Sequence, residues 1–314
     1  MKISFVIPCY RSEKTIENVV QEIKDKMNSL KKYEFEIILV NDCSPDNTFK
    51  VIKKLCDENS NIIGVSHAKN FGQHAAILDG FHFVSGDIVV CLDDDGQTPA
   101  GEVDKLIEKI KEGYDVVYAK YEHKKHALYR NLGSWINSMM NVIMLGKPKE
   151  LYMSSYFAAK RFVVEEAIRY TGAYPYLGGL VLRTTKNICD VKVEHRERTE
   201  GESGYSMRKL LGLWINGFTS FSILPLRVSS YIGGITAIVG LISAIVLIIR
   251  KLLNPGLVMG WSSTVSILLI LGGLILLVLG IMGEYVGRIY ILLNNSPQYV
   301  RNKVINYNGS KANG

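Results

Sequence analysis

Three consecutive carboxylates follow an apolar run near the first third of the chain. Residues 87–92 read Asp-Ile-Val-Val-Cys-Leu, and Asp93, Asp94 and Asp95 come directly after them. Like charges at the end of a buried strand are costly unless a cation neutralises them. Carboxylate oxygens suit Mg²⁺ or Mn²⁺, which keep coordination sites open for substrate phosphates. The alternative is a solvated acidic turn that caps the following helix.

Polar residues also follow two earlier apolar runs. Pro8 and Tyr10 follow residues 3–7, and Asp42 follows residues 35–40. The carboxyl ends of parallel strands share one edge of a sheet, and ligands bind there. The glycine-rich dinucleotide motif and the Walker A loop are both missing from the sequence. We therefore expect a nucleotide site that uses carboxylates and a metal instead of a glycine-rich cradle.

Strand and helix patterns alternate through the first 120 residues. The expected strands are 3–7, 35–40, 61–66, 87–92 and 114–118, and the expected helices are 12–30, 46–58, 72–84 and 99–111. A final strand is expected at 188–194. Apolar strands in this rhythm predict an α/β fold with a mostly parallel sheet that is covered on both faces.

Two long stretches carry no charged residue, and each supplies the roughly 20 apolar residues that span a bilayer. They run over 228–249 and 252–283, and they predict transmembrane helices at 228–250 and 261–283. A buried helix pair in a soluble protein is the alternative. An amphipathic pattern over 206–224 suits a helix at the membrane surface, although a core helix of the soluble domain would share it.

The expected organisation has five parts. They are a cytoplasmic catalytic domain at 1–200, an acceptor loop with an interfacial amphipathic helix at 201–227, the two spans, and a cytoplasmic tail at 284–314. Arg227 and Arg288 flank the spans and favour cytoplasmic termini. Arg250 and Lys251 fall in the short outer loop against this rule, and we expect them to snorkel to the interface.

Composition excludes several other classes of protein. The five cysteines are scattered and odd in number, which fits a reducing compartment and indicates neither a disulfide framework nor a zinc site. The net charge of +7 is modest, so attraction to anionic lipid is favoured over nucleic-acid binding. The start of the chain has no secretory signal pattern, so we expect no cleaved leader.

Ordered motifs give the chain a resemblance to a known family. Pro8-x-Tyr10, Asn41-Asp42-x-Ser44-x-Asp46-x-Thr48, Lys69-Asn70-x-Gly72 and Asp93-x-Asp95-x-Gln97-x-Pro99 resemble the motifs of family 2 glycosyltransferases with a GT-A fold. Later motifs resemble the polyprenyl-phosphate glycosyltransferases, bacterial relatives of dolichol-phosphate mannose synthase. These are His195-x-x-Arg198-x-x-Gly201-x-Ser203-x-Tyr205, Phe221 to Arg227 and Gly283 to Tyr290.

The sequence departs from the family pattern at several positions. Lys69 stands where the family commonly has arginine, which keeps the charge but loses the bidentate fork. Gly204 stands where a lysine is common, and residues 152–157 lack the acidic and arginine residues of many members. The QxxRW element of processive synthases is missing. The resemblance therefore argues against a polymerase and does not name the sugar.

The resemblance implies a set of site residues. Donor-nucleotide contacts are expected at Pro8, Tyr10, Asp42, Lys69, Asn70 and Asp93. A divalent metal, Mg²⁺ or Mn²⁺, is expected at Asp93, Asp95 and Gln97. Acceptor-phosphate contacts are expected at Arg130, Ser134, Arg198, Ser203 and Tyr205. The expected catalytic residues are Asp93, Asp95, Gln97, Arg130 and Arg198.

The implied reaction is transfer of a sugar from a nucleotide diphosphate sugar, with a uridine nucleotide preferred, to polyprenyl (undecaprenyl) phosphate. The acceptor phosphate has a second pKa of about 6 and is already anionic, so no general base is assigned. In-line displacement implies inversion at the anomeric carbon, and relatives suggest a homo-tetramer. A diacylglycerol or glycan acceptor is one alternative, and a non-catalytic membrane partner with a degenerate transferase domain is another.

Overall fold

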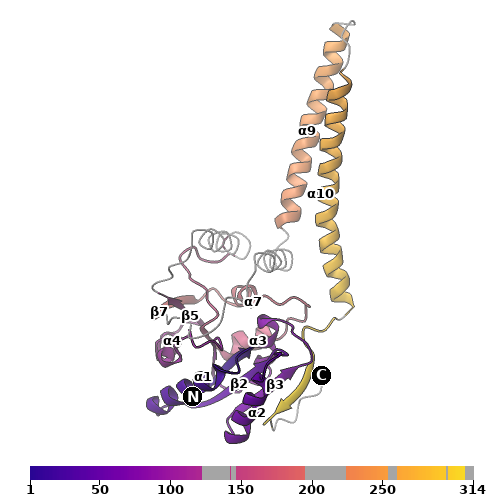
Figure 1. The fold of residues 1–314 in the computed structure, drawn as a ribbon. Coiled ribbons are helices and arrows are strands. Elements are labelled where there is room, and N and C mark those ends of the chain that lie inside the picture. The colour runs from indigo at the N-terminus through magenta and orange to yellow at the C-terminus, as the bar shows by residue number, and fades with distance from the viewer. Residues whose placement is uncertain (122–141, 143–145, 195–223, 254–259, 295, 308–314) are drawn as a thin grey trace. The chain divides into compact units, whose positions relative to one another are not determined.

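The structure is a computed structural model that describes residues 1–121, 142, 146–194, 224–253, 260–294 and 296–307. The chain divides into two compact units. One combines Met1–Lys209 with Asn295–Gly314, and the other is Leu210–Asn294. The larger unit is therefore built from both ends of the chain (Figure 1).

Within the described ranges the larger unit contains one eight-stranded sheet with the order β7-β5-β6-β4-β1-β2-β3-β8. The strands are β1 (Lys2–Cys9), β2 (Glu34–Asn41), β3 (Ile62–His67), β4 (Ile88–Cys91), β5 (Val116–Tyr121), β6 (Phe157–Lys160), β7 (Ile188–Val193) and β8 (Arg301–Ile305). Strand pairs β1–β2, β1–β4, β2–β3 and β5–β7 are parallel. β6 runs antiparallel to β4 and β5, and β8 runs antiparallel to β3. The predicted mostly parallel sheet is confirmed.

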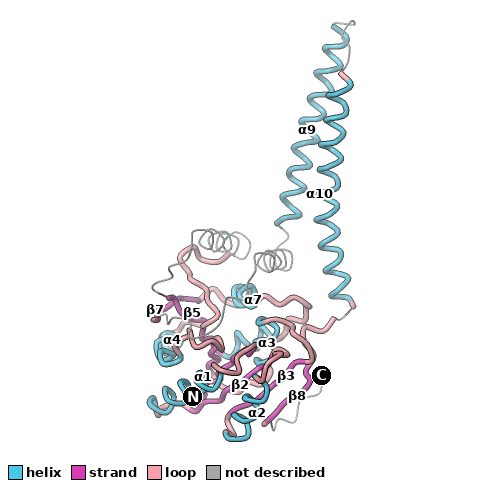
Figure 2. The backbone as a smooth tube through the Cα atoms, viewed as in Figure 1, coloured by secondary structure: helices cyan, strands magenta, loops and turns pink. Residues whose placement is uncertain are grey.

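Helices cover both faces of this sheet (Figure 2). On one face lie α1 (Ile16–Leu30), α2 (Thr48–Glu58) and α4 (Val103–Lys111), the last preceded by the short 3₁₀ helix η1 (Ala100–Glu102). On the other face lie α3 (Gln73–Phe81) and α6 (Arg161–Ala167), and α7 (Leu177–Thr184) packs on α6. Successive side chains of a strand point to opposite faces of the sheet. In β1, Ile3, Phe5 and Ile7 point to the face covered by α1 and join the core there.

The strand β8 is a feature that the sequence analysis did not anticipate. Residues 284–314 were expected to form a tail outside the catalytic domain, but Arg301–Ile305 extends the sheet beside β3. The side chain of Asn306 donates hydrogen bonds to the carbonyls of Asn59 and Ile62, at 2.9 and 2.7 Å. The segment after the second long helix is thus part of the larger unit, as Figure 1 shows for the yellow strand.

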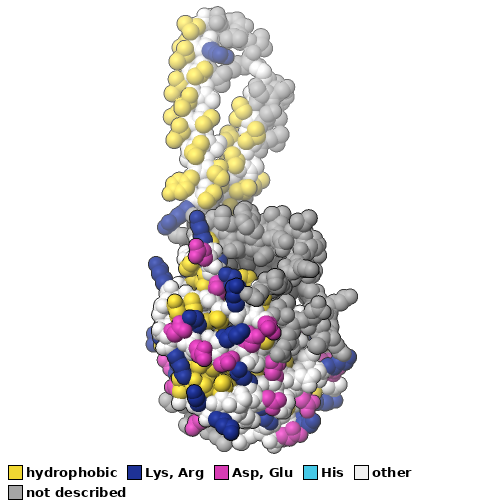
Figure 3. All heavy atoms as spheres, turned by 90° about the vertical axis from the view of Figure 1, so that its left-hand side faces the viewer, with side chains coloured by type: hydrophobic (Ala, Val, Ile, Leu, Met, Phe, Trp, Pro, Cys, Tyr) yellow, Lys and Arg dark blue, Asp and Glu magenta, His cyan; other side chains and the backbone are white. Residues whose placement is uncertain are grey.

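The smaller unit contains two long helices, α9 (Leu224–Leu253) and α10 (Trp261–Leu293). Each includes a segment long and apolar enough to cross a membrane, Leu226–Arg250 and Ile270–Leu293. Apolar side chains cover these helices, whereas Lys, Arg, Asp and Glu are spread over the larger unit (Figure 3). α10 continues past residue 283, the expected end of the second span. The expected interfacial helix at 206–224 lies almost wholly outside the described residues.

A close helix-to-sheet contact holds α3 against β1 and β2. A Cβ atom at Gly80 would lie 2.5 Å from Cγ1 of Val6 and 3.1 Å from Cγ2 of Val40. Valine side chains are stiff, so neither methyl group can swing aside without a shift of the backbone. Gly80 therefore sets the distance between α3, which carries site residues at its start, and the strands that end at the site.

Replacing Gly80 with alanine should destabilise the protein although alanine is the better helix former. Overpacking typically costs about 1–3 kcal/mol, against about 1 kcal/mol gained in helix propensity. We expect the midpoint of thermal unfolding in detergent to fall by roughly 2–6 °C. Gly178→Ala is the matched control, because its closest neighbour is the flexible end of Met153, at 2.9 Å. Equal midpoints for both variants would contradict this account.

Candidate active site

Four parallel strands end at the same edge of the sheet. β1 ends at Cys9, β2 at Asn41, β3 at His67 and β4 at Cys91. The register pairs Cys9 with Asn41, so these ends are level with one another. The residues that follow the strands therefore gather at this edge, as ligand-binding residues do in open α/β sheets.

The carboxylates after β4 connect three other elements. Oδ2 of Asp94 accepts a hydrogen bond from the backbone N–H of Tyr10, at 2.9 Å. Oδ1 of Asp93 accepts from the side-chain amide of Gln73 at the start of α3, at 2.8 Å, and its Oδ2 accepts from the hydroxyl of Ser155. The cluster is thus fastened to the end of β1, to α3 and to the loop before β6.

Asp95 and Gln97 form a turn directly after the cluster. Oδ1 of Asp95 accepts from the backbone N–H of Gln97, at 3.0 Å. Gly96 between them has a φ of +73°, a left-handed conformation that glycine adopts without strain. This turn follows β4 and contains Asp95 and Gln97 of the predicted metal set, and Asp93 comes just before it.

The electrostatics of the cluster favour a bound cation. Burial, together with the negative charges of Asp95 and Asp94, raises the pKa of Asp93 to about 6, although the bonds from Ser155 and Gln73 oppose the rise. Burial also raises the pKa of Asp94. In the described part of the chain, neither Asp93 nor Asp94 forms an ion pair with a lysine or arginine. A cation at this position would stabilise the ionised carboxylates.

The chemistry of the predicted donor set, Asp93, Asp95 and Gln97, suits a metal that shares its coordination with substrate. Among the described residues, no group of three or more His, Cys, Asp or Glu side chains is arranged to hold a metal ion. Two carboxylates and one amide oxygen would leave coordination sites for phosphate or water. Mg²⁺ and its relatives commonly bind in this way, through one or two carboxylates and substrate phosphates.

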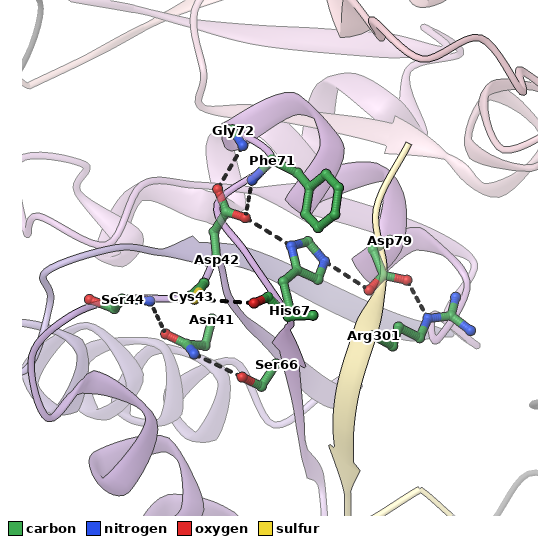
Figure 4. Close-up of polar contacts among 11 residues, drawn as sticks. Asn41, Asp42, Cys43, Ser44, Ser66, His67, Phe71, Gly72, Asp79 and Arg301 are labelled. Carbon is green, nitrogen blue, oxygen red and sulfur yellow. Dashed lines mark hydrogen bonds and ion pairs between the residues drawn. The ribbon is translucent and has the colours of Figure 1, made fainter. Parts of the chain in front are cut away.

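Asp42 lies beside this cluster, and the protein satisfies its carboxylate. Oδ1 accepts from Nδ1 of His67 at 2.9 Å and from the N–H of Phe71 at 2.8 Å, and Oδ2 accepts from the N–H of Gly72 at 2.7 Å (Figure 4). The sequence analysis expected a nucleotide to supply these donors. Asp42 is 2% exposed, so its direct contact with a nucleotide stays a prediction, and its observed role is to hold the chain at Phe71 and Gly72.

The motif from Asn41 to Thr48 folds back on the end of β1. Asp46 accepts from the hydroxyls of Ser44 and Thr48, at 2.5 and 2.6 Å. The hydroxyl of Ser44 also accepts from the N–H of Arg11, at 2.7 Å, where the backbone has a φ of +60°. These bonds outweigh burial and lower the pKa of Asp46 below its ordinary value. The signature residues therefore shape the turn that presents Tyr10.

The remaining predicted donor residues lie around the same edge. Pro8 is buried near the end of β1, and Tyr10 is 43% exposed just beyond it. Lys69 and Asn70 are exposed in the loop after β3, and the Lys69 ammonium lies 4.9 Å from the centre of the Phe71 ring. Their contacts with a nucleotide stay predictions. The predicted acceptor residues Arg130, Ser134, Arg198, Ser203 and Tyr205 lie outside the described residues.

Sequence reasoning missed several residues at this edge. Gln73 and Ser155 bind Asp93, and His67 binds Asp42. Burial lowers the pKa of His74 to about 4, and its Nδ1 has no hydrogen-bond partner among the described residues. The one signal in the sequence was the unusual composition of residues 152–157, which include Ser155. Gln73 and His74 sit in the expected helix 72–84, and His67 directly follows the expected strand 61–66, so all three are explained equally well as packing residues.

Comparison with known proteins identifies the family. The profile described as Glycosyl transferase family 2 matches residues 4–167. An undecaprenyl-phosphate 4-deoxy-4-formamido-L-arabinose transferase of Yersinia enterocolitica is 32% identical over 307 residues, which cover 97% of this chain and 94% of that protein. An uncharacterized glycosyltransferase of Bacillus subtilis is 31% identical over 306 residues, covering 96% of this chain and 94% of that protein.

The fold also matches a solved structure. It is glucosyl-3-phosphoglycerate synthase from Mycobacterium tuberculosis in complex with Mn²⁺, uridine-diphosphate-glucose and phosphoglyceric acid. The TM-score is 0.51 at 19% identity, with 68% of this chain and 78% of that chain covered. This likeness confirms the predicted GT-A fold, and the resemblance to polyprenyl-phosphate glycosyltransferases agrees with the relatives found. The chain belongs to glycosyl transferase family 2.

Proposed function

We propose that this protein transfers a sugar from a nucleotide diphosphate sugar to polyprenyl phosphate at the cytoplasmic face of a membrane, with inversion at the anomeric carbon. One observation carries the proposal. Buried carboxylates with excess negative charge lie at the carboxyl ends of the parallel strands, in a chain that also has two membrane-length helices. The name of the Yersinia enterocolitica relative, an undecaprenyl-phosphate sugar transferase, supports the lipid acceptor.

The donor half of the site is the end of β4 and its surroundings. Asp93, Asp95 and Gln97 would hold a divalent metal, Mg²⁺ or Mn²⁺, against the donor's diphosphate. When bound, such an ion neutralises the charge that develops on the leaving nucleoside diphosphate. The Mycobacterium tuberculosis neighbour binds Mn²⁺ together with a uridine nucleotide sugar, which supports this cofactor and a uridine donor for the present chain.

The protein contributes position and charge to the donor half. The bonds of Asp93 to Gln73 and Ser155 hold its carboxylate in one orientation. Ser155 precedes β6, so the loop that carries it reaches the cluster from the opposite side to Tyr10. Because transfer between two bound substrates gains most from orientation, rigid anchoring of this carboxylate favours the reaction.

The acceptor half needs cations, because two anions must approach each other. We propose that Arg130 and Arg198 bind the acceptor phosphate, with hydrogen bonds from Ser134, Ser203 and Tyr205. The lipid phosphate is itself the nucleophile and is already ionised near neutral pH, so the protein need not remove a proton. This division assigns the metal to the leaving group and the arginines to the attacking group.

The long helices suit a substrate that is half lipid. Their large aliphatic side chains, including Ile238, Leu241, Ile270 and Leu276, are mostly exposed, and in water such a surface would be costly. We propose that α9 and α10 span the membrane, with both termini in the cytoplasm. A polyprenyl chain would then stay in the bilayer while its phosphate meets the site. A homo-tetramer is an expectation from relatives.

The proposal is tested by transfer of a radiolabelled sugar in detergent. Purified protein would be mixed with undecaprenyl phosphate and a panel of nucleotide sugars, with and without EDTA. We expect one uridine donor to give a product that extracts into organic solvent and disappears with EDTA. Diacylglycerol in place of undecaprenyl phosphate is the matched acceptor, and a product made only from it would replace the acceptor proposed here.

Loss of one metal-binding carboxylate should abolish transfer without unfolding the protein. We expect Asp95→Asn to lower the rate by on the order of 100-fold or more, because the charge on the leaving group would no longer be neutralised. Removing a charge from a crowded cluster makes no cavity, so the unfolding midpoint should stay the same. Asp57→Asn, an exposed change on α2, is the control. Wild-type activity in Asp95→Asn would contradict the metal assignment.

Loss of an acceptor arginine should act on the other substrate. We expect Arg198→Ala to raise the KM for undecaprenyl phosphate by roughly 10-fold or more, because a charge-assisted bond to phosphate is lost. The affinity for UDP should be unchanged. The control is Arg169→Ala, which removes an exposed arginine that pairs with Glu166 on the surface. An equal loss of UDP affinity would move Arg198 to the donor half.

A further inference from the structure

The last strand of the chain lies against the loop that carries Lys69 and Asn70. We call residues 68–72 the donor loop. The N–H of Ala68 donates to the carbonyl of Val300, at 2.9 Å. The ring of Tyr299 stacks on the imidazole of His67 just before the loop, with centroids 5.7 Å apart and planes 5° from parallel. Residues after the second membrane-length helix thus contact the donor side directly.

A continuous set of charged side chains joins the same strand to the loop (Figure 4). Nε of Arg301 lies 2.6 Å from Oδ1 of Asp79, and Oδ2 of Asp79 lies 3.1 Å from Nε2 of His67. Nδ1 of His67 bonds to Asp42, and Asp42 accepts the two backbone N–H groups at the end of the loop. The path runs from β8 through α3 and β3 to the loop without a break.

The bonding pattern of His67 favours its positively charged form. Both of its ring nitrogens face carboxylate oxygens, and ionised carboxylates only accept, so this arrangement favours the doubly protonated imidazolium. Burial alone would lower the pKa of His67, but its bonds to Asp42 and Asp79 outweigh burial and raise the pKa above its ordinary value. With His67 in this form, the set holds two cations, His67 and Arg301, and two anions, Asp42 and Asp79, and its net charge is zero.

We propose that Arg301 is a positioning residue that holds the donor loop in place through Asp79, His67 and Asp42. The inference rests on the donor site proposed above, and it adds that β8, made after the membrane helices, completes that site. Arg301 also lies over the ring of Phe83, 4.8 Å from its centre. Its side chain is 26% exposed, so it is packed from one side and reaches water at the other.

Removing the Arg301 charge would leave two buried carboxylates with one imidazolium. Asp79 is 0% exposed in the last turn of α3. Asp42 lies at the edge of the sheet beside an exposed loop. A buried net charge is costly. Opening the donor loop would lower this free-energy cost by exposing Asp42 to water, and it would break the bonds of Asp42 to the N–H groups of Phe71 and Gly72.

Hydrogen exchange of the full-length protein in detergent tests this coupling. The variants are Arg301→Gln, Arg301→Lys as the charge-retaining rescue, and Lys303→Gln, which removes an exposed charge from the same strand. In Arg301→Gln we expect the amides of Phe71 and Gly72 to exchange roughly 10-fold faster. Exchange in β1 and α1 should be unchanged, and Arg301→Lys should recover part of the protection.

Binding of UDP with Mn²⁺ gives a second readout. We expect Arg301→Gln to weaken UDP roughly 10-fold and to raise the KM for the donor while kcat at saturating donor changes little. Lys303→Gln should match the wild type in both measurements. A loss confined to kcat would contradict positioning of the donor.

Other results would also decide whether Arg301 holds the donor loop. Unchanged exchange at Phe71 and Gly72 in Arg301→Gln would overturn the proposal. A uniform rise across the sheet would overturn it too, because Arg301 would then support the whole fold. The same effect from Lys303→Gln would reduce it to a surface-charge effect. If the wild type binds no UDP, the proposed function fails, and the exchange data alone still decide whether Arg301 holds the loop.

Discussion

The negative charge of a buried carboxylate must be compensated. The way in which each one is compensated separates the carboxylates that support the structure from those of the candidate site. Asp42 and Asp79 are compensated from within, by His67, Arg301 and backbone N–H groups. Asp93 and Asp94 have neutral donors but no lysine or arginine partner in the described part of the chain. An internally neutral set gives rigidity, whereas a cluster with excess negative charge is ready to take a cation from outside.

The two carboxylate groups share the same framework. Asp42 follows β2 and Asp93 follows β4, on either side of β1. Asp42 bonds to Gly72 just before α3, and Asp93 bonds to Gln73 at its first residue. Gly80 sets how closely α3 approaches the sheet. One helix thus spaces the donor loop from the acidic cluster, so a shift of α3 would disturb both halves of a donor site together.

Much of the fold could be predicted from the sequence because apolar runs and helix patterns alternate regularly up to Tyr118. The edge with Asp42 and Asp93 followed from that alternation. β6 could not be predicted, because four residues, Phe-Ala-Ala-Lys, carry no strand period. β8 could not either, since Arg-Asn-Lys-Val-Ile is a polar edge strand whose side chains are largely exposed. The charged set from Asp42 to Arg301 depends on contacts between residues 25, 12 and 222 positions apart, which no local pattern encodes.

The place of β8 in the sheet also sets an order of events during synthesis. β1 to β7 are made first, and domains generally fold in step with their synthesis. The edge of β3, however, stays without its partner until both long helices and the segment after them have left the ribosome. An open strand edge invites pairing with other chains. Completion of the sheet therefore waits for synthesis of the two long helices, and a chain that stops short of β8 is left with an exposed edge on β3 and without the contacts of β8 to the donor loop.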